Sequence, residues 1–196
     1  SLAVVFAFLS LIFIRLFRAE YVHIGKITLR QGNTTKPTGK IFSIVMLLIF
    51  LFSGHSAYVH YHAYIGDREY NKIISSENSV TLSLEDEKNK PVIQKAKTHL
   101  ELSAQWGLYA SLSLSRQLAS IYLTEKKYDL AEKYLKQMID LSSDNIEARH
   151  RLAKLYYVTN REDKSIEELQ KIIATENTGN NHDLRIQSEA QLMFGH

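Results

Sequence analysis

The chain has 196 residues, a formal net charge of +3 and no cysteine. Without cysteine, these residues hold no disulfide, thiolate nucleophile, Cys-ligated zinc or iron–sulfur cluster, or c-type haem attachment. The small net charge gives no case for nucleic acid as a partner. Charge is also uneven, because apolar residues crowd the first 66 positions and charged residues the remainder.

The first predicted element is an apolar helix at about 1–17, which is apolar to position 14 apart from Ser10 and continues past Arg15. Seventeen helical residues cover about 25 Å, slightly less than the roughly 30 Å hydrocarbon core of a bilayer. The run begins without a methionine or a basic region, which disfavours a signal peptide. We expect a transmembrane helix whose start is missing, or a chain trimmed from a longer protein.

A basic loop follows at 18–40, where Glu20 is the single acidic residue. The positive-inside rule therefore places this loop in the cytoplasm and both flanks on the opposite side of the membrane. Its alternating residues and the turn at Gln31-Gly32-Asn33 fit either a small hairpin or an ordered linker. The basic residues are Arg18, Lys26, Arg30, Lys36 and Lys40.

A second apolar run predicts a membrane helix at about 41–60, which completes a membrane domain over 1–66. We expect Tyr58, Tyr61 and Tyr64 in the aromatic belt at the membrane–water interface. A buried core helix is the alternative, but it would need more protein around it than this chain offers.

Three histidines, His55, His60 and His62, cluster at the outer end of this second helix. Histidine in a membrane can ligate haem b or line a proton path. A haem site would need partner histidines from another helix, and the first apolar helix has none. The expected role is therefore a partly hydrated side chain at the headgroup level, and we predict no cofactor and no metal.

A polar, weakly periodic connector is predicted at 67–90. Pro91 fits the first turn of a helix that continues to Trp106 and ends at Gly107. Its apolar stripe should cover the end of the structure that follows and so cap it.

The remainder of the chain contains one pattern written twice. Leu118-Ala119, Tyr122, Ala131 and Leu135 recur 34 residues later as Leu152-Ala153, Tyr156, Ser165 and Leu169. A fixed period of this size predicts a helical repeat array, with helices at about 111–124, 128–141, 145–158, 162–174 and 183–196.

These two segments resemble the tetratricopeptide repeat, in which helix A carries L-[G/A]-x-x-Y and helix B carries small-x-x-x-[L/F]. Ala119 and Ala153 are small where helix B must approach helix A closely. The usual aromatic residue of helix A is replaced by Ser115 and Arg149, and the closing proline of the first repeat is replaced by Ser143. The last residues resemble the opening of a third helix A, with Phe194-Gly195 at the positions of Leu118-Ala119, and the sequence stops within the motif.

The resemblance implies that a partner binds on the inner, concave surface of the A helices. Arg116 and Lys154 would pair with an acidic segment or a C-terminal carboxylate, and Tyr157 would give an aromatic contact. The pattern does not match the carboxylate clamp of chaperone-tail binders. In the alternative, this groove is a hydrated surface and another face docks the partner. The matching positions are Ser113, Arg116, Ser120, Leu123, Glu147, His150, Lys154 and Tyr157.

No nucleophile–base set, metal-spaced carboxylate pair or phosphate loop is present, so we predict no enzyme. The expected protein is all-α, with two transmembrane helices followed by a tetratricopeptide solenoid over 91–196. We expect a scaffold in a bacterial inner membrane that binds other protein subunits on the periplasmic side and contacts lipid, but binds neither nucleic acid nor a small-molecule substrate. The alternative is an accessory subunit, or a C-terminal fragment, of a membrane electron-transfer complex that uses haem, iron–sulfur or quinone.

Overall fold

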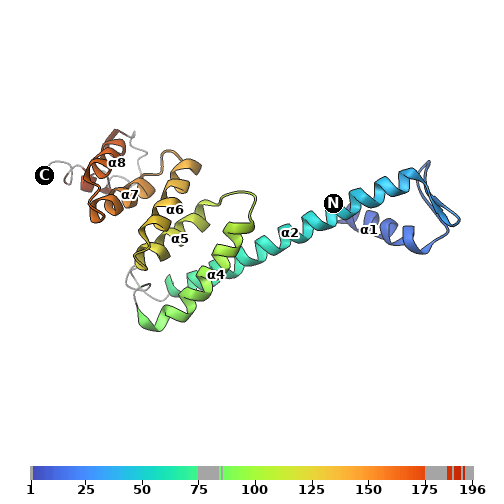
Figure 1. Cartoon of the computed structure of the whole chain (residues 1–196), viewed down its shortest axis with the longest axis horizontal. Coiled ribbons are helices and arrows are strands. Elements are labelled where there is room, and N and C mark those ends of the chain that lie inside the picture. Colours follow the sequence, from blue (N-terminus) through green and yellow to red (C-terminus); the bar gives the residue numbers. More distant parts are fainter. Residues whose placement is uncertain are drawn as a thin grey trace. The chain divides into compact units, whose positions relative to one another are not determined.

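The computed structural model describes residues 2–74, 84, 86–174, 185–186, 188–190 and 192. The chain forms two compact units, Ser1–Tyr58 and Val59–His196. Helix α2 (Pro37–Ile74) begins in the first unit and ends in the second, and Figure 1 labels it with the other helices.

The first unit combines two apolar helices with a small antiparallel sheet. After α1 (Leu2–Arg18), the strands β1 (Tyr21–Ile24), β2 (Ile27–Gln31) and β3 (Thr34–Thr35) pair in the order β1-β2-β3. Gly25 and Gly32 adopt positive φ angles of 58° and 61° in the two turns, a conformation that glycine adopts readily. The all-α fold class was therefore wrong at this loop, while the hairpin alternative is confirmed, because alternating residues and two glycine turns let it fold as strands.

The sheet is attached to the end of α1 and to the start of α2. Arg30 of β2 donates a hydrogen bond of 2.7 Å to the backbone carbonyl of Leu16, which satisfies one of the carbonyls left open at the end of α1. In the apolar part, Phe50 of α2 packs against Phe6 and Phe13 of α1, with ring centroids 5.7 and 5.5 Å apart. These contacts hold α1 and the first part of α2 as a helical hairpin.

Helix α2 is long and apolar enough to cross a membrane, and only 6% of its apolar window is buried. It is longer than the predicted 41–60, because it continues to Ile74 through residues expected in the connector. Helix α1 has 17 residues, about 25 Å of helix, so a second membrane span stays a prediction.

In the second unit, the helices begin and end within about two residues of the predicted positions. The predicted third repeat is helical at 185–186, 188–190 and 192, whereas Phe194-Gly195 lies outside the described residues. The bounds are η1 (Glu87–Asn89), α4 (Lys90–Trp106), α5 (Leu112–Thr124), α6 (Tyr128–Leu141), α7 (Ile146–Val158) and α8 (Glu162–Ala174).

The helices pair as the repeat pattern predicts, α5 with α6 and α7 with α8 (Figure 1). Ala119, Ala131 and Ala153 are fully buried. The hydroxyl of Ser165 on α8 donates a hydrogen bond of 2.9 Å to the backbone carbonyl of Ala153 on α7. A side chain this short reaches the opposite backbone only where the two helices approach closely, which confirms the role predicted for the small residues.

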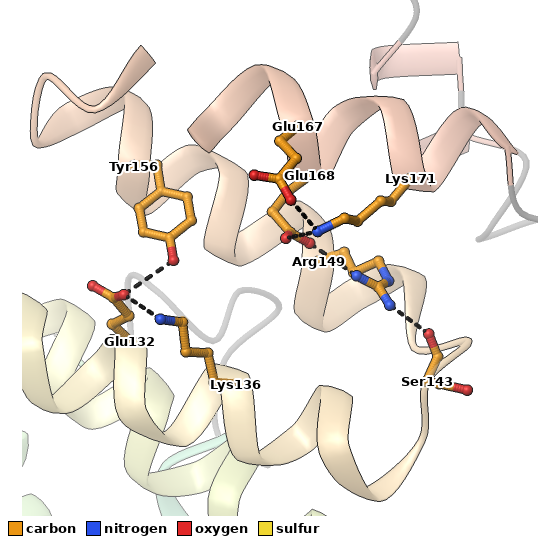
Figure 2. Close-up of polar contacts among 8 residues, drawn as sticks. All are labelled: Glu132, Lys136, Ser143, Arg149, Tyr156, Glu167, Glu168 and Lys171. Atoms are coloured by element: carbon orange, nitrogen blue, oxygen red, sulfur yellow. Dashed lines mark hydrogen bonds and ion pairs between the residues drawn. The ribbon is translucent and has the colours of Figure 1, made fainter. Parts of the chain in front are cut away.

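A polar contact joins each repeat to the preceding helix. The Tyr156 hydroxyl donates to Glu132 of α6 at 3.0 Å, and Lys136 pairs with the same carboxylate at 2.8 Å (Figure 2). Burial alone raises the pKa of Glu132, but hydrogen bonds from Lys136, Arg161 and Tyr156 lower it to about 2. The Tyr122 hydroxyl donates in the same way to Glu101 of α4. Helix α4 therefore contacts α5 in the same way as α6 contacts α7, through a glutamate that accepts a hydrogen bond from a tyrosine of the following helix.

The position of the missing aromatic in the second repeat holds an ion pair. Arg149 donates to Glu168 of α8 at 3.0 Å and to the backbone carbonyl of Ser143 at 2.8 Å, and Lys171 donates to Glu168 at 2.9 Å (Figure 2). The arginine thus joins both helices of its repeat to the turn before it.

The last turns of α2 pack against α4. A Cβ atom placed on Gly66 would lie 2.7 Å from Cγ of Leu100 and 3.1 Å from its backbone nitrogen. Tyr70 and Ile73 of α2 share one core with Ala96 and Leu100 of α4. The predicted capping helix α4 therefore also contacts the end of the apolar helix through buried side chains.

We predict that Ala153→Leu lowers the free energy of unfolding of the second unit by about 1–3 kcal/mol, because the added side chain overpacks the contact with Ser165. Denaturant titration, followed by the emission of the single tryptophan in the chain, measures this. Lys154→Leu, which changes the next residue of α7 at a side chain 55% exposed, is the matched control. Equal losses in the two variants would contradict the close approach of α7 and α8.

A second prediction concerns the pairing of α2 with α4. Gly66→Ala should destabilise the second unit by about 1–3 kcal/mol, because the new methyl group meets Leu100. Gly54→Ala is the control in the same helix, since a Cβ there meets nothing within 4 Å. The control should leave stability unchanged or raise it by up to about 1 kcal/mol. A Gly66→Ala variant as stable as the control would show that the two helices are not packed this way.

Candidate partner-binding face

Three of the predicted partner-binding side chains are accessible on the A helices α5 and α7. The side chains of Arg116 and Lys154 are 47% and 55% exposed, and Tyr157 is 60% exposed. Two cations and an aromatic ring can bind a carboxylate-bearing segment by charge-assisted hydrogen bonds and ring contacts. Together, these three residues are the accessible trio.

The side chains at the other predicted positions are partly or fully buried, except for Ser113 on the surface. Ser120 and His150 are only 6% and 7% exposed. Leu123 packs against the core cluster, and Ser113 is exposed. Buried Ser120 and His150 and partly buried Leu123 therefore pack beneath the face and are not its most accessible contacts.

Polar contacts link α5 to α7 along this face. Arg116 pairs with Glu147 at 3.5 Å, and Arg151 pairs with Glu147 at 2.7 Å while donating to the Ser120 hydroxyl at 2.8 Å. Arg151 was missed in the sequence, although its spacing of four residues from Glu147 signals a helical ion pair. These contacts bridge the two A helices on which the accessible trio lies.

The far side of α7 meets the described part of the third repeat. Glu189 lies 3.5 Å from His150, 4.0 Å from Lys154 and 3.7 Å from Arg185. Lys154 thus lies beside an acidic side chain of the next helix, as Arg116 does. An incoming carboxylate would compete with Glu147 and Glu189 for these two cations.

The near side of α5 is covered by the end of α2. Gln117 of α5 donates to the Asp67 carboxylate at 2.6 Å, and Tyr70 is buried in the shared core. Asp67 and Tyr70 were missed because their stretch of sequence is polar and weakly periodic, which is typical of a connector.

Of the three histidines His55, His60 and His62 in α2, His62 contacts a second histidine. Its Nδ1 atom lies 2.8 Å from Nδ1 of His99 on α4, so one ring donates and the other accepts. Burial lowers the pKa of His99, and His62 and Lys95 lower it further, while Glu69 raises it. His60 is exposed and His55 half-buried. Within the described ranges, no three His, Asp or Glu residues lie close enough together to hold a metal ion.

The His62–His99 pair predicts a pH-dependent stability. The pKa of His99 is lower in the folded protein than its ordinary value of 6.5, so the unfolded chain binds more protons as the pH falls below that value. The second unit should keep its full stability above pH 6.5 and lose stability as the pH falls toward the lower pKa of the folded state. Melting temperatures at about pH 7.5 and 5.5 measure this above the carboxylate range.

His99→Gln should flatten this dependence, whereas the control His60→Gln at an exposed histidine should keep it. A His99→Gln variant with the same loss between the two pH values would rule out this pair as the source.

The tetratricopeptide repeat family model matches residues 122–184. No curated protein and no solved structure gives a significant match. The matched range runs from Tyr122 through α6, α7 and α8, the same helices in which the small residues, the buried tyrosines and the polar turns repeat. The match and the paired helices together support tetratricopeptide repeats in this part of the chain, with no more specific identity.

Proposed function

We propose that this protein is a membrane-tethered scaffold whose tetratricopeptide unit binds or braces partner proteins in a membrane complex. Tetratricopeptide repeats are protein-interaction modules, so binding of other proteins follows from the family match in general terms. The tether is supported by α2, which has the length and composition of a membrane-crossing helix.

The main support for the proposal is that α2 is one continuous helix with residues in both parts of the chain. Exposed apolar side chains such as Leu51 and Phe52 occupy its first part, while Gly66, Tyr70 and Ile73 near its end pack into the repeat core. The first part of this helix exposes apolar side chains, and its last turns belong to the core of an interaction module. This combination suits a protein that holds partners at a membrane.

The chemistry of the partner follows from the accessible trio, which favours an acidic segment or a chain terminus. Exposed ion pairs such as Arg116–Glu147 contribute at most about 1 kcal/mol, so a partner carboxylate can displace Glu147 at little cost.

The proposed topology places the basic loop 18–40 in the cytoplasm and the repeat unit on the periplasmic side of a bacterial inner membrane. Because these 196 residues contain no cysteine, single cysteines introduced into them report on each side without background. Asn33→Cys and Gln170→Cys replace exposed residues of the loop and of α8. A membrane-impermeant maleimide should label position 170 in intact cells, and position 33 only after the membrane is opened. The reverse pattern would invert the topology.

We predict that Arg116→Gln with Lys154→Gln weakens partner binding while the repeat unit stays folded. Glutamine is preferred to glutamate, because a carboxylate at either position would face Glu147 or Glu189 and disturb the helix spacing. A photo-crosslinking residue at position 157 measures the contact in cells, and identification of the attached protein by mass spectrometry gives the partner. The double variant should lose most of this crosslink.

The control for this experiment places the crosslinker at exposed Gln170 on α8, away from the accessible trio in sequence and helix. Folding of the double variant is checked by its melting temperature. A folded double variant that crosslinks as strongly as the parent would remove this face as the binding surface.

A further inference from the structure

The loop between α4 and α5 exposes large apolar and aromatic side chains. Trp106 is 50% exposed, Leu108 66% and Tyr109 91%. Loop tips usually carry small or polar residues, and a group of exposed aromatic and apolar residues marks an interaction surface.

This loop lies beside α2. Val59, His60 and Ala63 of α2 line a groove of about 450 Å³ together with Gly107 and the other loop residues. A Cβ atom on Gly107 would lie 3.7 Å from Cγ1 of Val59, and the Gly107 N–H donates to the carbonyl of Ser103 at 2.8 Å. The loop is therefore held at the level of residue 59 of α2.

Along α2, this level follows directly after the apolar run. The exposed apolar residues end with Phe52, and Tyr58, Tyr61 and Tyr64 follow with exposed fractions of 43%, 58% and 64%. Seven residues of helix separate Phe52 from Val59, which is about 10 Å. A helix that leaves the hydrocarbon core after Phe52 would thus be at headgroup depth near Val59, where tyrosine and tryptophan are enriched.

We propose that the loop with Trp106, Leu108 and Tyr109 is seated in the headgroup region of the bilayer that α2 crosses. The proposal rests on the membrane tether of the proposed function and adds a second point of contact between the repeat unit and lipid. Exposed aromatic rings suit this environment because they are amphipathic. Lys133 of α6 lines the same groove and can pair with lipid phosphate. The loop would fix the repeat unit against the membrane surface.

The test uses Trp106, which is the single tryptophan of the chain. The full chain is reconstituted in phosphatidylcholine vesicles, with either plain acyl chains or chains brominated close to the headgroup. We expect the emission of Trp106 to shift to the blue, to fall in the brominated vesicles, and to be protected from iodide in the water. Leu108→Asn with Tyr109→Asn should reduce the quenching by the brominated lipid.

The matched control moves the tryptophan to α7 by Trp106→Phe with Tyr157→Trp, at a residue 60% exposed. That tryptophan should be quenched by iodide and not by brominated lipid. Resistance of the reconstituted protein to alkaline carbonate extraction tests the tether separately. Extraction of the protein would overturn the tether and with it this inference. A resistant protein whose Trp106 is quenched by iodide, or is protected equally in both vesicle types because a second copy covers the loop, would overturn the inference alone.

Discussion

At 2.9 Å from the carbonyl oxygen of Ala153, the hydroxyl of Ser165 marks how closely two paired helices approach. Only small residues permit this approach, and it recurs where Gly66 of α2 meets Leu100 of α4. Protein cores are densely packed, so neighbouring helix pairs stack closely, and buried Tyr122 and Tyr156 lie between them. The carboxylates of Glu101 and Glu132 accept from those tyrosines. Pair geometry, stacking and buried polar contacts all depend on these small residues.

The candidate binding face is a consequence of the same stacking. Once the A helices lie side by side, their charged residues meet across the gap. Arg116 of α5 pairs with Glu147 of α7, and Arg151 of α7 donates to Ser120 of α5. Such exposed ion pairs contribute little stability, so their cations remain available to a competing carboxylate. The face thus combines contacts between the two A helices with charges that can exchange partners, which suits recognition of an acidic segment.

Helix α2 makes the membrane-type segment and the repeat array parts of one element. Its last turns replace what would otherwise be a linker, with Gly66 against Leu100 and Asp67 accepting from Gln117 of α5. The exposed loop beside Val59 would add a second point at which the array meets lipid.

The sequence by itself determined the helices of the repeat array and their pairing. The 34-residue period and the small residues occur at fixed spacings along the chain, so they can be recognised without knowledge of distant contacts. It also indicated the apolar helices and the exposed trio of Arg116, Lys154 and Tyr157. For the basic loop, the alternating residues allowed either a hairpin or a linker, and the structure shows strands there. Tertiary structure alone decided that residues 67–74 continue α2 into the core. It also decided that Ser120 and His150 are buried. These outcomes depend on contacts between residues far apart in sequence, such as Gly66 with Leu100 and Arg151 with Ser120, and no local pattern encodes the partner of such a contact.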